Sequence, residues 1–316
     1  MKTISSKRRL LWLGGIAFVA ISASLFYVNF FLARPTGVGP AGPEVSAEPF
    51  QSTWTDRKVH LVGIGDSITA GLGASAQNLT FFNRLLHNPP NEFDDMADKS
   101  LLTVLPNLTS KNLAMSGSNS SQHLQVIEER LSPKPNDVFG IVVMTTGGND
   151  LIHSYGKSLP RECAMYGASL EQAQPWIESF RQRLSKMLDL ITERFPGGCE
   201  IYLANIYDPT DGVGDAPSIY LPHWRDGLAI HAAYNSVIVE ATQSRENVHL
   251  VPIYEAFLGH GSHCRQFWRT TYNWKDPNYW YYSNVEDPND RGYDAIRRSF
   301  LNVIVKNSQL RPRGEK

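Results

Sequence analysis

The chain has 316 residues, of which 19% are charged, and its formal net charge is −1 at pH 7. This length allows one large domain or two small ones with a core of ordinary size. Because no strong basic field is available to attract phosphates, the composition argues against nucleic acid as a partner.

The N-terminal segment, residues 1–34, is expected to enter a membrane. Basic residues precede residues 10–33, which form a run of 24 uncharged and mostly apolar residues. About 20 such residues span a bilayer as a helix, whereas the apolar core of a cleavable signal has about 7–15. A cleavage site at Ile21–Ser24 is the alternative, but the apolar run continues beyond it. We therefore expect an uncleaved signal-anchor. In either case the basic flank stays cytoplasmic and the rest of the chain is exported.

Residues 35–53 begin with a stretch rich in proline and glycine, which predicts a linker without a core-forming pattern. The soluble domain is then expected over residues 54–310. An exported domain with three cysteines suits one disulfide and one free thiol, although the spacing of Cys163, Cys199 and Cys264 does not single out the pair. The same spacing does not suggest a metal site.

Short apolar runs alternate with helical patterns through this domain. The expected buried strands are Val59–Gly65, Lys111–Gly117, Phe139–Gly148, Glu200–Tyr207 and a run that starts at Val248. The expected helices cover residues 81–88, 121–131, 170–194, 226–244 and 290–306. This alternation is typical of parallel βαβ units, so it predicts an α/β fold: a three-layer α/β/α sandwich around a parallel five-stranded sheet. Ligands of such sheets lie beyond the carboxyl ends of the strands.

Polar or small residues follow three successive strands at that edge. Ser67 lies in "GIGDSITAG", on a tight turn between a strand and a helix that would hold it exposed beside free backbone N–H groups. Gly117 lets a backbone N–H approach a ligand closely, and the amide of Asn149 is a hydrogen-bond donor. Taken singly, each has an ordinary structural role: a helix N-cap, a turn glycine and an Asx turn. Their coincidence at three strand ends favours a functional site.

In order and spacing, "GDSITAG", "NLAMSG", "GGND" and "PNDRGYDAI" together resemble the SGNH (GDSL-type) hydrolase family over roughly residues 58–305. The resemblance implies a flavodoxin-like sandwich. It also implies that Ser67 is a nucleophile and that an oxyanion hole forms from the backbone N–H groups of Ser67 and Gly117 with the amide of Asn149. Fixed donors of this kind stabilise developing negative charge, each by about 3–4 kcal/mol.

The last block of the family is normally Asp-x-x-His, and this chain departs from it. Aligned on Pro288, the two positions hold Asn284 and Asp287. An aspartate with an ordinary pKa of about 4 does not readily replace imidazole as the base for a serine hydroxyl. A deeply buried aspartate with a raised pKa is the conceivable exception.

The sequence therefore predicts that another histidine has taken over as the base. His263, and after it His260, lie in "FLGHGSHCRQFW", which follows the fifth strand and so begins at the active-site edge. A triad is defined by geometry rather than chain order. Asp287 would then orient the histidine or the incoming group. An ordinary hydrogen-bonded loop histidine remains the alternative for each.

We expect an exported, membrane-anchored serine esterase that cleaves acyl or acetyl esters of carbohydrate or lipid through a Ser67 acyl-enzyme, without a cofactor. The alternatives are an acyltransferase that acts on an envelope sugar and a degenerate domain that binds carbohydrate or lipid. Aromatic residues crowd Trp268–Tyr282. They suit either stacking on a substrate or packing of a lid onto the domain.

Overall fold

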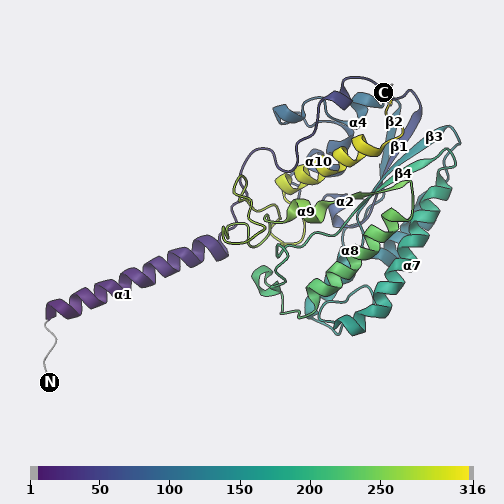
Figure 1. The fold of residues 1–316 in the computed structure, drawn as a ribbon. Coiled ribbons are helices and arrows are strands. Elements are labelled where there is room, and N and C mark those ends of the chain that lie inside the picture. The colour runs from purple at the N-terminus through teal and green to yellow at the C-terminus, as the bar shows by residue number, and fades with distance from the viewer. Residues whose placement is uncertain (1–5, 313–316) are drawn as a thin grey trace.

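A parallel five-stranded sheet in the order β2-β1-β3-β4-β5 forms the centre of the computed structural model, which describes residues 6–312 (Figure 1). The strands are β1 Lys58–Ile64, β2 Leu108–Asn112, β3 Val138–Met144, β4 Cys199–Ala204 and β5 Val248–Val251. This strand order is that of flavodoxin-like folds. The predicted α/β/α sandwich is therefore confirmed.

Helices cover both faces of the sheet because the strands are apolar on both. In β1, Val59 and Leu61 pack into the core on one face, and Val62 and Ile64 into the core on the other. The first face is covered by α3 Phe81–Leu86, α4 Leu101–Val104 and α10 Asp290–Asn307. The second is covered by α5 Ser120–Arg130, α7 Leu170–Arg194 and α8 Gly227–Gln243 (Figure 1).

Short helices mark the carboxyl ends of the strands. They are α2 Ser67–Ala70 after β1, α6 Gly148–Ile152 after β3 and α9 Ile253–Phe257 after β5. β1, β3 and β4 end one to four residues before their expected ends, and β2 covers Leu108–Asn112 rather than Lys111–Gly117. β2 is an edge strand that pairs only with β1. The backbone beyond it still follows β1, since Leu113 and Met115 donate to Gly63 and Gly65, but it no longer forms a regular ladder.

The N-terminal apolar run forms α1 Ser6–Tyr27, which continues as a π-helix, Val28–Leu32 (η1). Together they project from the domain as one rod (Figure 1). Residues Arg8–Leu32 are long and apolar enough to cross a membrane, and the apolar window of this span is not buried by the domain.

The segment 35–53 differs from the predicted linker because it packs on the domain. Ala41, Val45 and Phe50 are buried in the core under α10. The backbone N–H of Ala41 donates to Oδ2 of Asp294 at 3.0 Å. Small apolar side chains scattered among prolines and glycines are sufficient to fill this seam, and composition alone does not reveal such packing.

The expected disulfide is also not formed. Cys163, Cys199 and Cys264 are all free, and the last two are buried. Burial raises the pKa of the Cys264 thiol to about 12, so this thiol is unreactive in the folded domain.

Candidate active site

Ser67 is the first residue of α2 and directly follows a turn that only glycine can make. Gly65 has φ +145°, and a Cβ there would lie 2.4 Å from the carbonyl oxygen of Thr145. Asp66 caps α2, because its Oδ1 accepts the N–H of Ile68 at 3.1 Å. The same oxygen accepts the hydroxyl of Thr145 at 2.8 Å. These bonds join the ends of β1 and β3 and hold Ser67 at the carboxyl edge of the sheet.

Asp287 lies beside Ser67. In the sequence it occupies the position at which the SGNH hydrolase family, which this chain resembles, carries its histidine. Burial raises the pKa of the Asp287 carboxyl, whereas the hydroxyl of Ser67 and the amide of Asn284 lower it. Oδ1 of Asp287 is buried and meets no donor with full hydrogen-bond geometry among residues 6–312. The contact with Ser67 is therefore close enough to affect the carboxylate but is not a well-aligned hydrogen bond. Apo active sites often show such loose geometry.

The turn that carries Asp287 is fixed from both sides. Asn284 donates from Nδ2 to Oδ2 of Asp287 at 2.6 Å and accepts the backbone N–H of Asp287 at 3.1 Å. Two residues later Asn289 caps α10 by accepting the N–H groups of Arg291 and Gly292, each at 3.0 Å. The start of a long buried helix therefore positions the carboxylate.

A second carboxyl group lies close to the first. Burial raises the pKa of Asp66 to about 6, hydrogen bonds from Thr145 and Ile68 oppose this rise, and the negative charge of Asp287 adds to it. Two like charges near one serine disfavour each other's ionised form. The pair thus keeps a carboxylate near Ser67 more basic than an aspartate in water.

Asn149 lines the same cavity as Ser67, and Gly117 directly precedes a residue that is hydrogen-bonded to Asn149. Asn149 is in α6 and donates from Nδ2 to the carbonyl of Ser118 at 2.8 Å. That bond leaves the second N–H of the amide for another acceptor. Gly117 has φ +76°, and a Cβ there would meet no atom within 4 Å, so the glycine is needed for its backbone conformation rather than for space. The Ser118 carbonyl links the Gly117 turn to Asn149.

Neither predicted loop histidine reaches Ser67. Nε2 of His263 pairs with Oδ1 of Asp215 at 2.8 Å, and His260 stacks on Trp280 with ring centroids 3.4 Å apart. Neither of them lines the cavity at Ser67. The loop is held elsewhere because the carboxylate of Asp211 accepts three of its backbone N–H groups, those of Gly259, Gly261 and His263. The structure therefore does not bring the expected histidine base to the serine.

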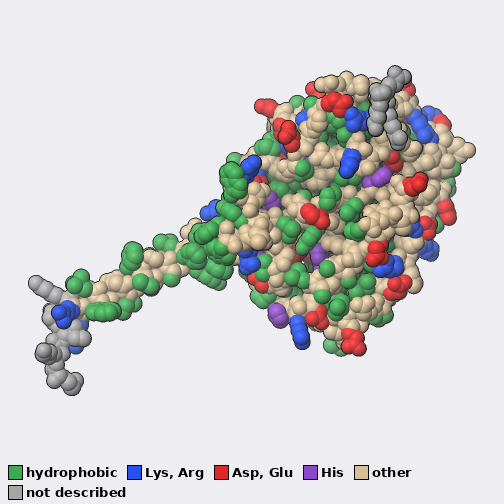
Figure 2. Space-filling view, viewed as in Figure 1, with side chains coloured by type: hydrophobic (Ala, Val, Ile, Leu, Met, Phe, Trp, Pro, Cys, Tyr) green, Lys and Arg blue, Asp and Glu red, His purple; other side chains and the backbone are tan. Residues whose placement is uncertain are grey.

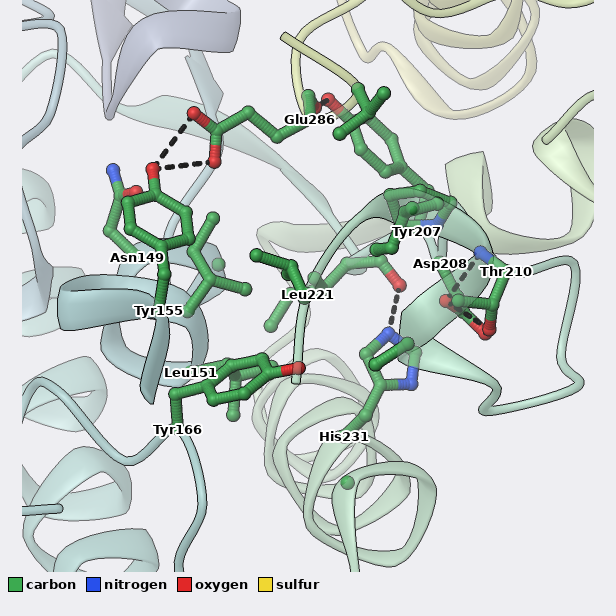
Figure 3. A pocket seen from close by; sticks show the side chains of 18 of the residues that line it. Asn149, Leu151, Tyr155, Tyr166, Tyr207, Asp208, Thr210, Leu221, His231 and Glu286 are labelled. Carbon is green, nitrogen blue, oxygen red and sulfur yellow. Dashed lines mark hydrogen bonds between the residues drawn. The ribbon is translucent and has the colours of Figure 1, made fainter. Parts of the chain in front are cut away.

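The cavity next to Ser67 has a volume of about 170 Å³. Its walls are mainly apolar and include Leu151, Tyr166, Ile206, Leu221 and Trp224 (Figure 3). The sequence reasoning did not single out these residues, because they come from loops and helix starts without a recognisable pattern.

Three further polar groups line the cavity, namely Tyr155, Glu286 and His231. Tyr155 donates to both carboxylate oxygens of Glu286, at 2.9 and 2.8 Å, and so closes the cavity on one side (Figure 3). Nε2 of His231 donates to the carbonyl of Ile206 at 2.9 Å, and burial lowers the pKa of His231. It is therefore a neutral wall residue. No cluster of His, Cys, Asp or Glu suited to a metal ion occurs within residues 6–312.

The fold has several solved relatives. A phospholipase A1 from Streptomyces albidoflavus matches with a TM-score of 0.52 at 18% identity, over 80% of this chain and 100% of its own. A lipase from a goat rumen metagenome matches with a TM-score of 0.50 at 19% identity, again over 80% and 100%. At such identities these matches show a common fold. A search of curated proteins found no match.

The sequence itself carries the family assignment. The family model described as "GDSL-like Lipase/Acylhydrolase family" matches residues 64–295, a range that starts just before the Ser67 turn and ends inside α10. That range contains every polar residue placed around Ser67 above. The chain therefore belongs to the GDSL-like lipase/acylhydrolase family.

Proposed function

We propose that this hydrolase is an exported, membrane-anchored serine esterase that cleaves carboxylic esters through an acyl-enzyme on Ser67. The observation that carries the proposal is that Ser67 and Asn149 line one apolar cavity and that the Asp287 carboxylate interacts with the Ser67 hydroxyl. A nucleophile, a proton acceptor and a donor for the developing oxyanion are the three groups that acyl transfer needs.

Asp287 takes the role of base in this proposal. It accepts the proton of the Ser67 hydroxyl as Oγ attacks the ester carbonyl, and it returns that proton to the departing alcohol. Water then attacks the acyl-enzyme. Asp287 accepts a proton from this water and returns it to Ser67 Oγ as the carboxylic acid is released. A carboxylate is a weaker base than imidazole, but burial raises its pKa in the direction that catalysis requires. The Asn284 hydrogen bond keeps one oxygen engaged, so that Oδ1 is left for the serine.

The oxyanion of the tetrahedral intermediate would lie between the free N–H of Asn149 and the backbone N–H groups of Ser67 and Gly117. The Asn149 amide is already oriented by its bond to Ser118. Donors that are fixed before the reaction need no reorganisation during it, which is the source of their catalytic effect.

The size of the cavity favours a short acyl group. Its volume of about 170 Å³ is close to that of an engineered apolar cavity of about 150 Å³ that holds benzene. We expect esters with roughly four to six acyl carbons to be better substrates than long-chain esters. Acetyl esters would fit but would leave part of the apolar wall uncovered.

The anchor assignment depends on α1 and η1. Their apolar span, Arg8–Leu32, has 25 residues, and its apolar window is not covered by the domain. The basic residues before it favour a cytoplasmic N-terminus, with the hydrolase domain on the outer side of the membrane.

One observation favours a second candidate, a domain that binds an ester or glycan without turnover. The imidazole expected at position 287 is replaced by Asp287. An acyltransferase would use the same Ser67 chemistry with a sugar hydroxyl in place of water.

The test is active-site labelling with a fluorophosphonate, compared between the wild type and Ser67→Ala. The proposed esterase is labelled, and Ser67→Ala is not labelled although its circular dichroism is unchanged. Equal turnover of a short p-nitrophenyl ester by folded Ser67→Ala protein contradicts the proposal. A wild type that binds such esters but is neither labelled nor active favours the binding domain. Product analysis with an added sugar acceptor separates hydrolysis from transfer.

A further inference from the structure

The outer end of the N-terminal helix is not separate from the hydrolase domain. Trp268 lies against three phenylalanines of α1 and η1, with ring centroids 5.6 Å from Phe26, 5.6 Å from Phe30 and 5.9 Å from Phe31. Phe267 adds a contact with Phe30 at 5.5 Å. We call these five residues the aromatic collar. Figure 2 shows hydrophobic side chains gathered where the rod meets the domain.

Along the helix, the collar lies at the level at which the hydrocarbon core of a bilayer would end. A hydrocarbon core takes about 20 helical residues. Counted from Leu10, the first residue after the basic pair Arg8 and Arg9, such a span ends next to Phe30. Tryptophan, which Trp268 contributes to the collar, is enriched at this level of membrane proteins. Phe267 and Trp268 belong to the domain, yet their contacts hold them at the same level.

Packing against the helix does not bury these rings. The exposed fractions remain 58% for Phe267 and 44% for Trp268. A purely intramolecular junction would leave this apolar area in water. Arg265 and Arg269 flank the two rings in the sequence, and cationic side chains next to an aromatic belt suit the phosphates of lipid headgroups. The surface therefore has the composition of a membrane interface.

The same junction is connected to the catalytic cavity. Arg34, two residues after η1, donates to the carbonyl of Ser218, and its guanidinium lies over the ring of Tyr220 at 5.2 Å. The segment 216–224 that contains both residues supplies Ala216, Ile219, Leu221 and Trp224 to the wall of the cavity. Arg34 thus links the end of the helix to the segment that forms one wall of the cavity.

We propose that the aromatic collar sits in the interfacial layer of the bilayer that α1 enters, so that the domain rests on the membrane surface with the 216–224 wall at headgroup level. This inference rests on the proposed membrane anchoring. It adds that Phe267 and Trp268 of the domain contact lipid directly, and that the partner of this surface is a phospholipid bilayer.

Tryptophan quenching tests it, because the chain offers three informative tryptophans. Trp12 lies in α1, Trp268 lies in the collar, and Trp274 is 74% exposed and stacks on no residue of α1 among the described contacts. Full-length protein and its Trp12→Phe, Trp268→Phe and Trp274→Phe variants are placed in phosphatidylcholine vesicles, with lipid brominated near the top of the acyl chains as the quencher. The difference between the wild type and each variant gives the emission of one tryptophan.

The proposal expects Trp12→Phe and Trp268→Phe each to remove a quenchable part of the emission, and Trp274→Phe to remove an unquenched part. If Trp12 is quenched but Trp268 is not, the helix enters the membrane but the aromatic collar does not contact lipid, and the proposal is wrong. If Trp268 and Trp274 are quenched equally, the contact is not specific to the collar and the proposal is also wrong. An unquenched Trp12 contradicts the membrane anchor itself, and with it the collar, while leaving the esterase proposal to its own test.

Discussion

Asn284 donates its side-chain N–H to Oδ2 of Asp287 at 2.6 Å, three residues along the chain. In the Asp-x-x-His block that the sequence resembles, the same spacing places a carboxylate behind an imidazole. Here an amide lies behind a carboxylate. Each pair carries one negative charge before reaction, but in this chain the charge lies beside Ser67. In the proposed mechanism, proton transfer therefore leaves a neutral acid next to the oxyanion rather than an imidazolium, which gives less stabilisation and predicts a slow enzyme.

Asp287→Asn should lower kcat by about 10²–10⁴, since it removes the proton acceptor while keeping the size of the side chain. Asp290→Asn is the matched control, because the Asp290 carboxylate is held by Ser75, does not line the cavity and has no part in the proposed proton transfer. Steady-state kinetics on a short p-nitrophenyl ester measures both. Equal losses in the two variants would mean that the turn matters only for structure.

The pH dependence of the wild type follows from the raised pKa of Asp287. The base works only when ionised, so activity is present above this pKa and is lost as pH falls through it. Because burial raises the pKa, the loss should begin at higher pH than for an aspartate in water, whose pKa is about 4. A pH profile of kcat/KM that stays flat down to pH about 4 would contradict the role of Asp287.

Restoring the family's usual pair, with Asn284→Asp and Asp287→His together, should place an imidazole at Ser67. We expect the double variant to exceed the single variant Asp287→His in kcat by about 10-fold or more, because a histidine without its carboxylate lacks the correct tautomer and orientation. Its activity should rise with pH near 6.5. A folded double variant without activity would show that position 287 is not where the base acts.

Asn149→Ala should reduce kcat by about 10²–10³ with little change in KM, as expected for loss of one oxyanion donor. Asn149 also donates to the carbonyl of Ser118. The thermal unfolding of the variant and the wild type must therefore be compared, so that a loss of structure is not taken for a loss of catalysis. A rise in KM alone would make Asn149 a substrate-binding residue.

Much of this site was readable from the sequence because parallel strands bring their ends to one edge. Ser67 and Asn149 follow β1 and β3, which pair along their whole length, and so they line one cavity. Leu170–Arg194 was predicted at the correct bounds because its apolar spacing is regular and Ser169 caps it with Gln172.

The proposed base was harder to predict because its role depends on contacts between distant segments. The ordinary pKa of aspartate argued against Asp287, and only the folded chain provides the burial that raises it. His263 was selected by its place after β5. Its partner Asp215 and the Asp211 carboxylate that holds its loop come from another connection, after β4, whose path the sequence did not reveal.

A substitution in the wall of the cavity should change the length of acyl chain that the cavity accepts. Leu221→Ala should shift the preferred p-nitrophenyl ester toward longer acyl chains, because Leu221 lines the cavity and its truncation enlarges it. Leu159→Ala is the control, since Leu159 is 86% exposed and is not part of the cavity wall. An unchanged chain-length profile in Leu221→Ala would mean that the acyl group binds elsewhere.

Asp66 should also affect stability. Its pKa is raised to about 6 in the folded state, from about 4 in the unfolded chain. The folded protein therefore binds the extra proton, and the contribution of this group to stability falls as pH rises between these two values. Asp66→Asn should remove that dependence. The difference in free energy of unfolding between variant and wild type should change by about 2 kcal/mol between pH 4 and 7, measured by urea denaturation. A constant difference would mean that Asp66 is not protonated in this range.

Under the proposed membrane anchoring, the packed segment after the helix also determines where a protease would have to cut to release the domain. Arg291 binds the carbonyl oxygens of Thr36, Gly39 and Pro40, and Ala41 and Val45 are buried behind them. A protease that cut one bond between residues 37 and 45 would leave both new ends bound to the domain by these contacts. Shedding of the enzyme would instead require a cut on the membrane side of Arg34, where the chain enters the collar.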